Sequence, residues 1–246
     1  MNKLLKECAL DEKCSYIDGH TQTTHYKIID MCTSEHCLEL IQRGWRRFGT
    51  MFFRPICATC TACESIKIDV KNYEFSKSAR RVIRKNEDLK IIMQPPTLTQ
   101  EHLDLFTAYH DHMEGKRDWD NQPINARNYY SSFVQGYGDF GYEVLYYEGE
   151  TLIGVDLVDV LEDGISSIYF YYDPQQEKRS LGRLSMYQQI NYAKEHNLAW
   201  IYMGYYVQDC VSLAYKSSYT PYLTLQERPT QEQKPLWYCK APLKAL

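Results

Sequence analysis

The segment Ser166-Ser-Ile-Tyr-Phe-Tyr-Tyr-Asp-Pro174, followed by Arg179-Ser-Leu-Gly-Arg183, determines the fold that we predict for this chain. The first segment reads as a strand, because alternate side chains point to opposite faces of a sheet. Pro174 ends it, since proline has no N–H to donate to a neighbouring strand. Ser180 then provides a helix N-cap, and apolar residues recur at helical spacing as far as residue 196. One face of the strand carries Ile168, Phe170 and Tyr172, and the other carries Ser167, Tyr169 and Tyr171.

The start of this predicted helix is a candidate site for an anion. The first N–H groups of a helix have no partner within it, and the helix dipole adds positive charge there. A phosphate or a developing oxyanion suits such a place, which Arg179 and Arg183 flank. An ordinary strand–helix connection with solvated arginines explains the same residues equally well.

The 246-residue chain is long enough for one large domain or two small ones, and 44% of its residues are hydrophobic. A formal net charge of −4 means that any contact with nucleic acid must come from local basic patches. The sequence has neither a run of about 18 apolar residues nor a signal-peptide core, which predicts a cytoplasmic protein. Its nine cysteines are then expected to be reduced thiols or metal ligands.

Residues 142–206 carry the order strand-strand-strand-helix-strand, which is typical of an α+β domain. Strands are expected at 142–147, 151–160, 165–172 and 199–206, with hairpin turns between the first three.

The dipeptide Pro95-Pro96 is where we place a boundary between an N-terminal domain, 1–95, and a C-terminal domain, 96–246. The N-terminal domain is rich in cysteine. Within it, residues Trp45–Pro55 are predicted to form a hairpin around Gly49.

Cysteines at C-x₂-C-x₂-C spacing form the candidate metal site. Cys57, Cys60 and Cys63 have a spacing that lets thiolates face one ion, and Cys14 is the candidate fourth ligand. Zinc or an iron–sulfur cluster fits this set. Unligated thiols in a reducing compartment fit it as well.

The candidate surface for nucleic acid is a predicted helix that Ser76 opens. Its positive charges lie four residues apart, which is unfavourable unless a partner such as a phosphate backbone neutralises them. A solvated helix face is the alternative interpretation. The basic residues are Lys77, Arg80, Arg81, Arg84 and Lys85.

Seven motifs, in register from about Cys14 to Pro221, resemble those of the aminoacyl-tRNA–protein transferases. This family includes the arginyltransferases and the bacterial aspartate/glutamate leucyltransferases, and the chain is more similar to the latter in length and cysteine arrangement. The motifs are Gly44-Trp-Arg-Arg-Phe-Gly49, Arg54-Pro-Ile-Cys-Ala-Thr-Cys-Thr-Ala-Cys63, Ser76-Lys-Ser-Ala-Arg-Arg81, Ser166–Pro174, Arg179-Ser-Leu-Gly182, Ile201-Tyr-Met-Gly-Tyr-Tyr206 and Tyr215-Lys216.

The resemblance implies a GNAT-like acyltransferase fold in the C-terminal half, with the cysteine-rich N-terminal half packed on it. It also implies transfer of leucine from leucyl-tRNA to the α-amine of proteins that start with Asp or Glu, which marks them for degradation. The partners are then aminoacyl-tRNA and acceptor proteins, with no membrane involved. Because the ester is already activated, no cofactor is required for the transfer.

The loop at Arg179–Gly182 matches only part of the Q/R-x-x-G-x-G/A pattern of acetyl-CoA-binding GNAT proteins, because Leu184 replaces the second small residue. We therefore expect a bulkier donor, such as the 3′ end of a charged tRNA. Three alternatives remain open: arginine as the donor amino acid, an N-acyltransferase that uses acyl-CoA, and a non-catalytic module that binds tRNA or degrons.

Within the implied activity, Asp173 is predicted to orient or deprotonate the acceptor amine. Arg179 and the helix N–H groups are predicted to stabilise the oxyanion. Tyr172 or Tyr205 is predicted to protonate the leaving ribose oxygen.

The acidic side chain of the acceptor requires a cationic pocket. Arg46 and Arg47, on opposite faces of the first hairpin strand, are the first candidates, and Lys216 is the second. His110 is a further candidate for substrate binding, although a histidine on an apolar helix stripe is more often part of the core. The tRNA is predicted to bind the basic helix at 77–85, and the leucine pocket has no predicted position.

Overall fold

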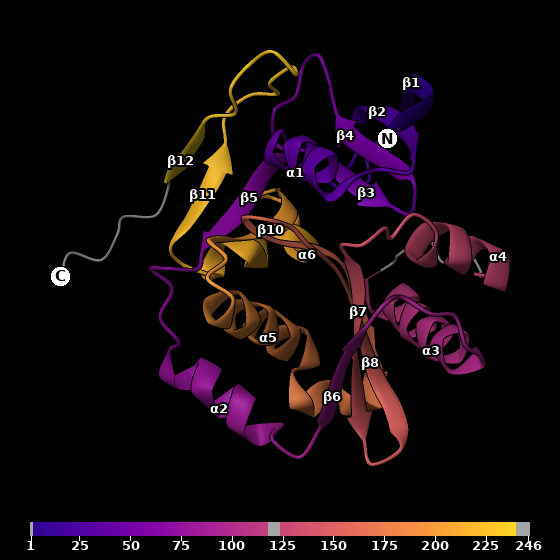
Figure 1. Cartoon of the computed structure of the whole chain (residues 1–246), viewed down its shortest axis with the longest axis vertical. Helices are drawn as coiled ribbons and strands as arrows, with labels where there is room; N and C mark the ends of the chain where they lie inside the picture. The colour runs from indigo at the N-terminus through magenta and orange to yellow at the C-terminus, as the bar shows by residue number, and fades with distance from the viewer. Residues whose placement is uncertain (1, 118–123, 240–246) are drawn as a thin grey trace.

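A computed structural model describes residues 2–117 and 124–239 and places their strands in two sheets (Figure 1). The smaller sheet has the order β1-β2-β4-β3, and its neighbouring strands are antiparallel. α1 (Ser34–Gln42) precedes its last hairpin. The strands are β1 (Lys3–Lys13), β2 (Thr21–Asp30), β3 (Arg46–Phe48) and β4 (Met51–Pro55).

The larger sheet has the order β12-β11-β5-β10-β9-β8-β7-β6, in which β9 and β10 are parallel and the other described neighbours are antiparallel. Its strands are β5 (Glu64–Asp69), β6 (Lys90–Gln94), β7 (Gly141–Glu148), β8 (Thr151–Val160), β9 (Gly164–Tyr172), β10 (Trp200–Tyr206), β11 (Tyr222–Leu225) and β12 (Trp237–Cys239).

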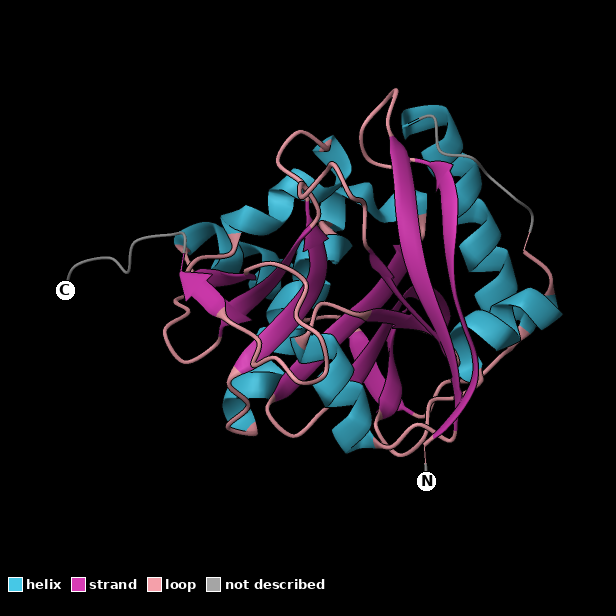
Figure 2. Cartoon of the chain, turned by 90° about the horizontal axis from the view of Figure 1, so that it is seen from above, coloured by secondary structure: helices cyan, strands magenta, loops and turns pink. Residues whose placement is uncertain are grey.

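Helices cover both faces of the larger sheet, and the turned view shows the strands gathered between them (Figures 1 and 2). α2 (Lys77–Lys85) and α5 (Leu181–Glu195) cover one face, and α3 (Gln100–Arg117) covers the other. No helix in the described ranges is long and apolar enough to cross a membrane. The shorter helical segments are α4 (Ala126–Tyr129), η1 (Tyr130–Val134), η2 (Pro174–Arg179), α6 (Val211–Ala214) and η3 (Tyr215–Ser218).

The predicted order strand-strand-strand-helix-strand is confirmed, because β7, β8 and β9 form an antiparallel meander and β10 returns beside β9 through α5. β9 and β10 pair where Gly164–Ser166 face Trp200–Tyr202. Beyond these residues the two strands diverge, while β10 continues to pair with β5 as far as Tyr206. The divergence exposes backbone groups on the facing edges of β9 and β10, and these groups need other partners.

The predicted face alternation along β9 is wrong at its middle. The pairing of β8 with β9 shifts between Leu157 and Val158, because Leu157 faces Tyr169 and Val158 faces Ser167. Ile168 is therefore an extra residue, a β-bulge, so that Ser167 and Tyr169 point to opposite faces. Periodicity alone gives no sign of such a bulge.

The predicted division at residue 95 stays a prediction. The described structure places both sides of it in one sheet. In the larger sheet β5 and β6 precede residue 95, and β7 to β12 follow it. The predicted hairpin at Trp45–Pro55 is confirmed as β3 and β4, and its two arginines point to opposite faces.

Candidate active site

Arg46 lies in the gap where β9 and β10 diverge. Its Nη2 donates to the carbonyl oxygens of Ser167 and Ile168, at the bulge of β9. Its Nη1 is buried and has no hydrogen-bond partner among the residues that the structure describes. A buried donor without a partner costs roughly 1–3 kcal/mol, and more when it is charged, so this nitrogen is a candidate ligand-binding group.

β10 brings a second cation to Arg46. Gly204 has a φ of 79°, and a Cβ at this position would lie 2.7 Å from Nε of Arg46, so the position requires glycine. Lys216 in η3 donates from Nζ to the carbonyl oxygen of Tyr205 at 2.8 Å. Burial and then the charge of Arg46 lower the pKa of Lys216 to about 7. Two of the predicted substrate-binding residues are therefore close together.

Tyr16, from the loop between β1 and β2, is partly buried near Arg46. Burial raises the pKa of Tyr16 to about 12, Cys63 raises it further, and Arg46 opposes the shift. Among the described residues, neither Arg46 nor Lys216 forms an ion pair with a carboxylate. A charged guanidinium whose Nη1 is buried without a counter-ion among the described residues is unfavourable, which points to an anionic ligand.

Ser167 links Arg46 to the face of the larger sheet that α5 covers. Its carbonyl oxygen binds Arg46, and its hydroxyl accepts from Nε2 of Gln189 at 3.3 Å. The same Nε2 donates to Oδ2 of Asp156 at 2.9 Å, and the hydroxyl of Ser185 donates to that oxygen at 2.8 Å. Burial raises the pKa of Asp156 to about 7, although both hydrogen bonds oppose the shift.

Aromatic rings line the hairpin side of this site. Phe48 lies two residues after Arg46 in β3, and its ring centroid is 5.8 Å from that of Phe133 and 6.3 Å from that of Tyr169. The rings of Phe133 and Tyr169 stack at 5.6 Å. All three side chains are partly exposed, and we call Phe48, Phe133 and Tyr169 the aromatic wall.

His110 lies behind the aromatic wall. Its ring stacks on Phe106 with centroids 4.1 Å apart, and its Nε2 shares a hydrogen bond of 2.9 Å with the hydroxyl of Tyr169. Burial lowers the pKa of His110, which favours the neutral ring. The predicted role of His110 in substrate binding stays a prediction, and its contacts are those of a core histidine.

Arg47 is not available to a substrate, which corrects the prediction that it binds the acceptor. The residue is 5% exposed, and it forms a bidentate ion pair with Asp159, in which Nε lies 2.7 Å from Oδ2. Nη1 donates to the carbonyl oxygens of Gly49 and Gly136. Arg47 therefore joins the two sheets, because Asp159 is in β8.

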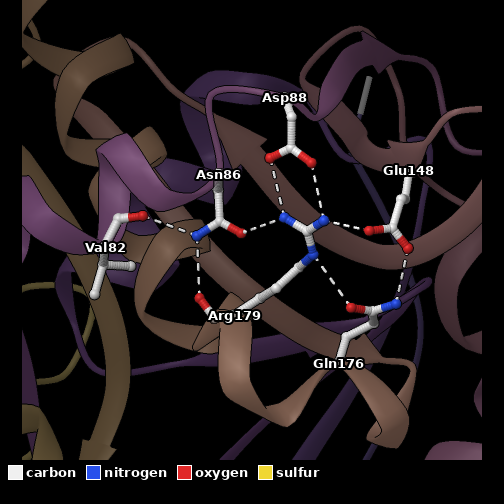
Figure 3. Close-up of polar contacts among 6 residues, drawn as sticks. All are labelled: Val82, Asn86, Asp88, Glu148, Gln176 and Arg179. Atoms are coloured by element: carbon white, nitrogen blue, oxygen red, sulfur yellow. Dashed lines mark hydrogen bonds and ion pairs between the residues drawn. The ribbon is translucent and has the colours of Figure 1, made fainter.

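Arg179 is also fully occupied, so its predicted oxyanion role is not supported (Figure 3). Its guanidinium donates to both carboxylate oxygens of Asp88 at 3.0 and 2.9 Å, and to Glu148. Further bonds to Gln176 and Asn86 use its remaining N–H groups. These acceptors hold the loop before α5 against neighbouring elements.

Ser180 occupies the N-cap position of α5 without acting as the predicted side-chain cap. It has a left-handed φ of 57°, and its side chain forms no capping hydrogen bond. Its carbonyl oxygen accepts from the N–H groups of Arg183 and Leu184. The first N–H groups of α5, those of Leu181 and Gly182, donate no hydrogen bond to Ser180.

Tyr172 and Asp173 lie at the far end of β9 from Arg46. Six residues of strand separate Asp173 from Ser167, which is about 20 Å at about 3.3 Å per residue. Asp173 caps η2 by accepting from the N–H of Gln175 at 2.9 Å. The predicted roles of Tyr172 and Asp173 at an acceptor bound by Arg46 are not supported, because both residues are out of reach.

The hydroxyl of Tyr205 is directed toward the N-terminal part of the chain. It lies 3.0 Å from the carbonyl oxygen of Gly44 and 3.1 Å from that of Phe53. Burial raises the pKa of Tyr205 well above its usual value. The predicted proton relay through Tyr205 is not supported, because its proton is held by these carbonyls.

The predicted basic helix is α2, and Ser76 caps it by accepting from the N–H of Ala79 at 3.1 Å. α2 lies beside the start of α5, since Lys85 donates to the carbonyl oxygen of Lys178 and Asn86 donates to that of Arg179. Its role in binding tRNA stays a prediction. The exposed basic residues are Lys77, Arg80, Arg81, Arg84 and Lys85.

The four cysteines of the candidate metal site lie near one another. Burial raises the pKa of Cys63 to about 12, and Cys14, Cys57 and Cys60 raise it further. However, no group of three or more Cys, His, Asp or Glu side chains in the described ranges is arranged to hold a metal ion. A metal at these residues is therefore not supported.

A cavity of about 620 Å³ adjoins this cysteine region. Cys63, Glu64 and Glu227 line it, together with Arg228. The guanidinium of Arg228 donates to the carbonyl oxygens of Cys57 and Cys60, so it fixes the cysteine loop.

Sequence reasoning missed Gly204, Ser167 and Tyr16. Gly204 carried a signal, because an isolated glycine within a strand often marks a close approach of another group. Ser167 and Tyr16 carried none, since their importance depends on contacts between segments that are far apart in the sequence.

Family models match the chain on both sides of residue 95. Models described as arginine-tRNA-protein transferase, N terminus and C terminus, match residues 12–81 and 101–226. The chain belongs to the arginine-tRNA-protein transferase family, as its motifs predicted.

Among curated relatives, the chain is similar to proteins named aspartate/glutamate leucyltransferase. The protein of Campylobacter jejuni subsp. jejuni serotype O:6 is 47% identical over 214 residues, covering 87% of this chain and 90% of the relative. That of Helicobacter hepaticus is 40% identical over 224 residues, covering 91% and 93%.

Two solved structures are also similar at low scores. The structure of L-PGS from Bacillus licheniformis has a TM-score of 0.43 and 16% identity, covering 59% of this chain and 45% of that chain. That of FemX has a TM-score of 0.44 and 8% identity, covering 80% and 79%.

Proposed function

We propose that this protein transfers leucine from leucyl-tRNA to the α-amine of proteins that begin with Asp or Glu, and so marks them for degradation in the cytoplasm. The observation that carries the proposal is the unpartnered Nη1 of Arg46 beside Lys216. The relatives named aspartate/glutamate leucyltransferase support the choice of donor and acceptor.

Arg46 is the proposed ligand of the acidic side chain of the acceptor. Nη1 carries two N–H donors, and Nη2 is already held by the carbonyl oxygens of Ser167 and Ile168. The guanidinium is therefore fixed in position before the acceptor arrives, which reduces the entropy lost on binding. Hydrogen bonds to charged groups contribute about 1.5–3 kcal/mol each, enough to select an acidic side chain over a neutral one.

The aromatic wall is the proposed surface for the donor amino acid. Its rings come from β3, η1 and β9, and they offer carbon-rich faces that suit a leucine side chain. The three residues of the wall carry no carboxylate to pair with an arginine side chain, so the wall favours leucine as the donor.

α2 is the proposed binding surface for the tRNA backbone. Its exposed cations lie beside the start of α5, and the helix N-terminus there suits a phosphate group near the 3′ end. We also propose that the C-terminal half is a GNAT-like acyltransferase fold, which the parallel pairing and divergence of β9 and β10 support.

The reaction proposed for this site is direct aminolysis. The acceptor amine attacks the carbonyl carbon of the aminoacyl ester, and the bond between that carbon and the ribose oxygen breaks. The ester is already activated, so the proposed transfer requires neither ATP nor a cofactor. Positioning of the two substrates is its main source of rate, on the order of 7–11 kcal/mol at best.

The proposal is tested by offering three donors to the protein together with a peptide that starts with Asp. Labelled leucyl-tRNA, arginyl-tRNA and acetyl-CoA are supplied separately, and the modified peptide is measured by mass spectrometry. We expect transfer from leucyl-tRNA and little from the other two. Preferential transfer from arginyl-tRNA or acetyl-CoA would overturn the assignment of the donor.

A further inference from the structure

The proposed reaction needs a group that removes a proton from the acceptor amine. An amine at the N-terminus has a pKa of about 7.7–8.0, so most of it is protonated at neutral pH. A bound Asp or Glu residue holds this amine only a few covalent bonds from its side-chain carboxylate. A group that deprotonates the amine must therefore lie close to Arg46, and Asp173 is too far along β9.

Lys216 lies at the required place. Arg46 packs against Gly204 and Lys216 binds the carbonyl oxygen of Tyr205, so successive residues of β10 hold the two side chains. Resting on the proposed function, we propose that the uncharged amine of Lys216 is the general base of the transfer. Its single described hydrogen bond, to Tyr205, uses one N–H and leaves the nitrogen lone pair free to accept a proton.

The acceptor nitrogen loses two protons during the reaction. The Lys216 amine takes one proton from the acceptor ammonium and becomes an ammonium itself. The freed amine attacks the ester carbonyl carbon, and the carbon–oxygen bond to the ribose breaks. The ribose oxygen takes a second proton from the new amide nitrogen, and Lys216 releases its proton to solvent.

The groups that face Lys216 favour its uncharged form at neutral pH. Burial and the positive charge of Arg46 disfavour the ammonium, whereas Cys210 has the opposite effect. When a carboxylate binds Arg46, part of this positive charge is neutralised, so Lys216 becomes a better proton acceptor in the complex with the acceptor. Binding of the correct acceptor thus promotes its own deprotonation.

The Lys216→Arg variant distinguishes two possible roles of Lys216, which are a general base and a ligand of the acceptor carboxylate. Arginine keeps the positive charge but cannot lose its proton in a protein. Single-turnover transfer of leucine to an Asp-starting peptide is measured for the wild type, Lys216→Arg and Lys216→Met between pH 6 and 9. Lys194→Arg, an exposed lysine of α5, is the matched control. Thermal melting and leucyl-tRNA binding of each variant establish that it is folded.

The inference predicts that Lys216→Arg lowers the rate constant about 100-fold or more while the KM for the peptide changes less than threefold. The wild-type rate constant should rise with pH, with an apparent pKa near 7 that Lys216→Arg lacks. A rate constant within threefold of the wild type in Lys216→Arg would overturn the role of Lys216 and leave the proposed function intact. A wild-type rate constant that is flat from pH 6 to 8.5 would do the same. Absence of leucyl transfer by the wild type would overturn the proposed function and this inference with it.

Discussion

Arg46 combines two opposed situations in one side chain. Nη2 donates to two carbonyl oxygens of β9, whereas Nη1 is buried and has no acceptor in the described ranges 2–117 and 124–239. A protein that only needed to fill the gap between β9 and β10 would be better served by an apolar side chain, because burial of an unpaired charge is costly. The arrangement is understandable if Nη1 binds a carboxylate during the reaction.

Gly204→Ala tests whether Arg46 must occupy this position. The new Cβ would meet Nε and Cζ of Arg46 at 2.7 and 2.8 Å, so the guanidinium must move. We expect the KM for an Asp-starting peptide to rise about tenfold or more, with a loss of about 1–3 kcal/mol in stability from the left-handed φ. Steady-state kinetics and urea unfolding measure the two effects.

Gly149→Ala is the control for this prediction. Gly149 has a left-handed φ of 60°, and a Cβ added there would meet no atom within 4 Å. It should show a similar loss of stability with an unchanged KM. An equal KM for both variants would contradict the importance of the Arg46 position.

Asp156 is predicted to make stability depend on pH. Its pKa is raised to about 7 in the folded protein, above the value of about 4 expected in the unfolded chain. The unfolded state therefore loses its proton first as pH rises, so the Asp156 contribution to stability decreases between about pH 4 and pH 7. In Asp156→Asn this contribution is absent, and the difference in unfolding free energy should favour the variant progressively, by up to about 1.4 kcal/mol per pH unit.

Urea unfolding of the wild type and Asp156→Asn at pH 5, 6 and 7 measures this difference. The structure has room for a proton on the Asp156 carboxyl, because Oδ1 of Asp156 and Oε1 of Gln189 are buried and have no donor within the described part of the chain. A difference between the two proteins that stays constant with pH would show that Asp156 is ionised throughout this range.

At the scale of single elements, β9 and α2 define the two ends of the proposed site. β9 carries the bulge that holds Arg46, and its other end leads into the loop held by Arg179. α2 lies beside this loop with its cations exposed. A donor bound by α2 and the start of α5 would therefore approach the acceptor along β9.

Removing positive charge from α2 should weaken the binding of leucyl-tRNA. We expect Arg80→Gln, Arg81→Gln and Arg84→Gln combined to lower the steepness of the salt dependence, by about 0.7–0.9 in log–log slope for each phosphate that is no longer neutralised. Filter binding at several salt concentrations measures the slope. The control removes three exposed lysines of β1, Lys3, Lys6 and Lys13. An equal effect of the two triple variants would exclude α2 as the specific surface.

The elements themselves could be predicted from sequence because their signals are local. The cap at Ser76, the hairpin around Gly49 and the stop at Pro174 each depend on neighbouring residues, and the structure has all three. The bulge at Ile168 could not be predicted, since it depends on how β8 pairs with β9.

The whole molecule depends on the junction of its two sheets. Arg47 of the smaller sheet and Asp159 of the larger sheet form a buried bidentate ion pair. Arg47→Met leaves the Asp159 carboxylate buried without its partner, which should cost about 3–5 kcal/mol. Replacing both residues, as Arg47→Met with Asp159→Leu, should restore part of this loss, as measured by urea unfolding. Additive losses in the double variant would mean that the two residues stabilise the fold independently.

Contacts with residues that are distant in the sequence determine which of the predicted site residues are free to bind a substrate. The sequence put Arg46 and Arg47 side by side and Arg179 at a helix start, but it did not indicate that Asp159, Asp88 and Glu148 would occupy two of these three arginines. Arg46 could be selected only after its surroundings were known. The family could be recognised because its motifs are spread along nearly the whole chain.

The selectivity of Arg46→Met for the first residue of the acceptor tests the central claim most directly. Leucyl transfer is measured to peptides that start with Asp and with Asn and are otherwise identical, for the wild type and the variant. A ratio of rates for the two peptides does not depend on how much of each protein is active. We predict that the wild type prefers Asp and that the preference falls about 10- to 100-fold in Arg46→Met, as expected when a hydrogen bond to a charged group is removed. An unchanged preference would contradict the claim that Arg46 recognises the acidic side chain.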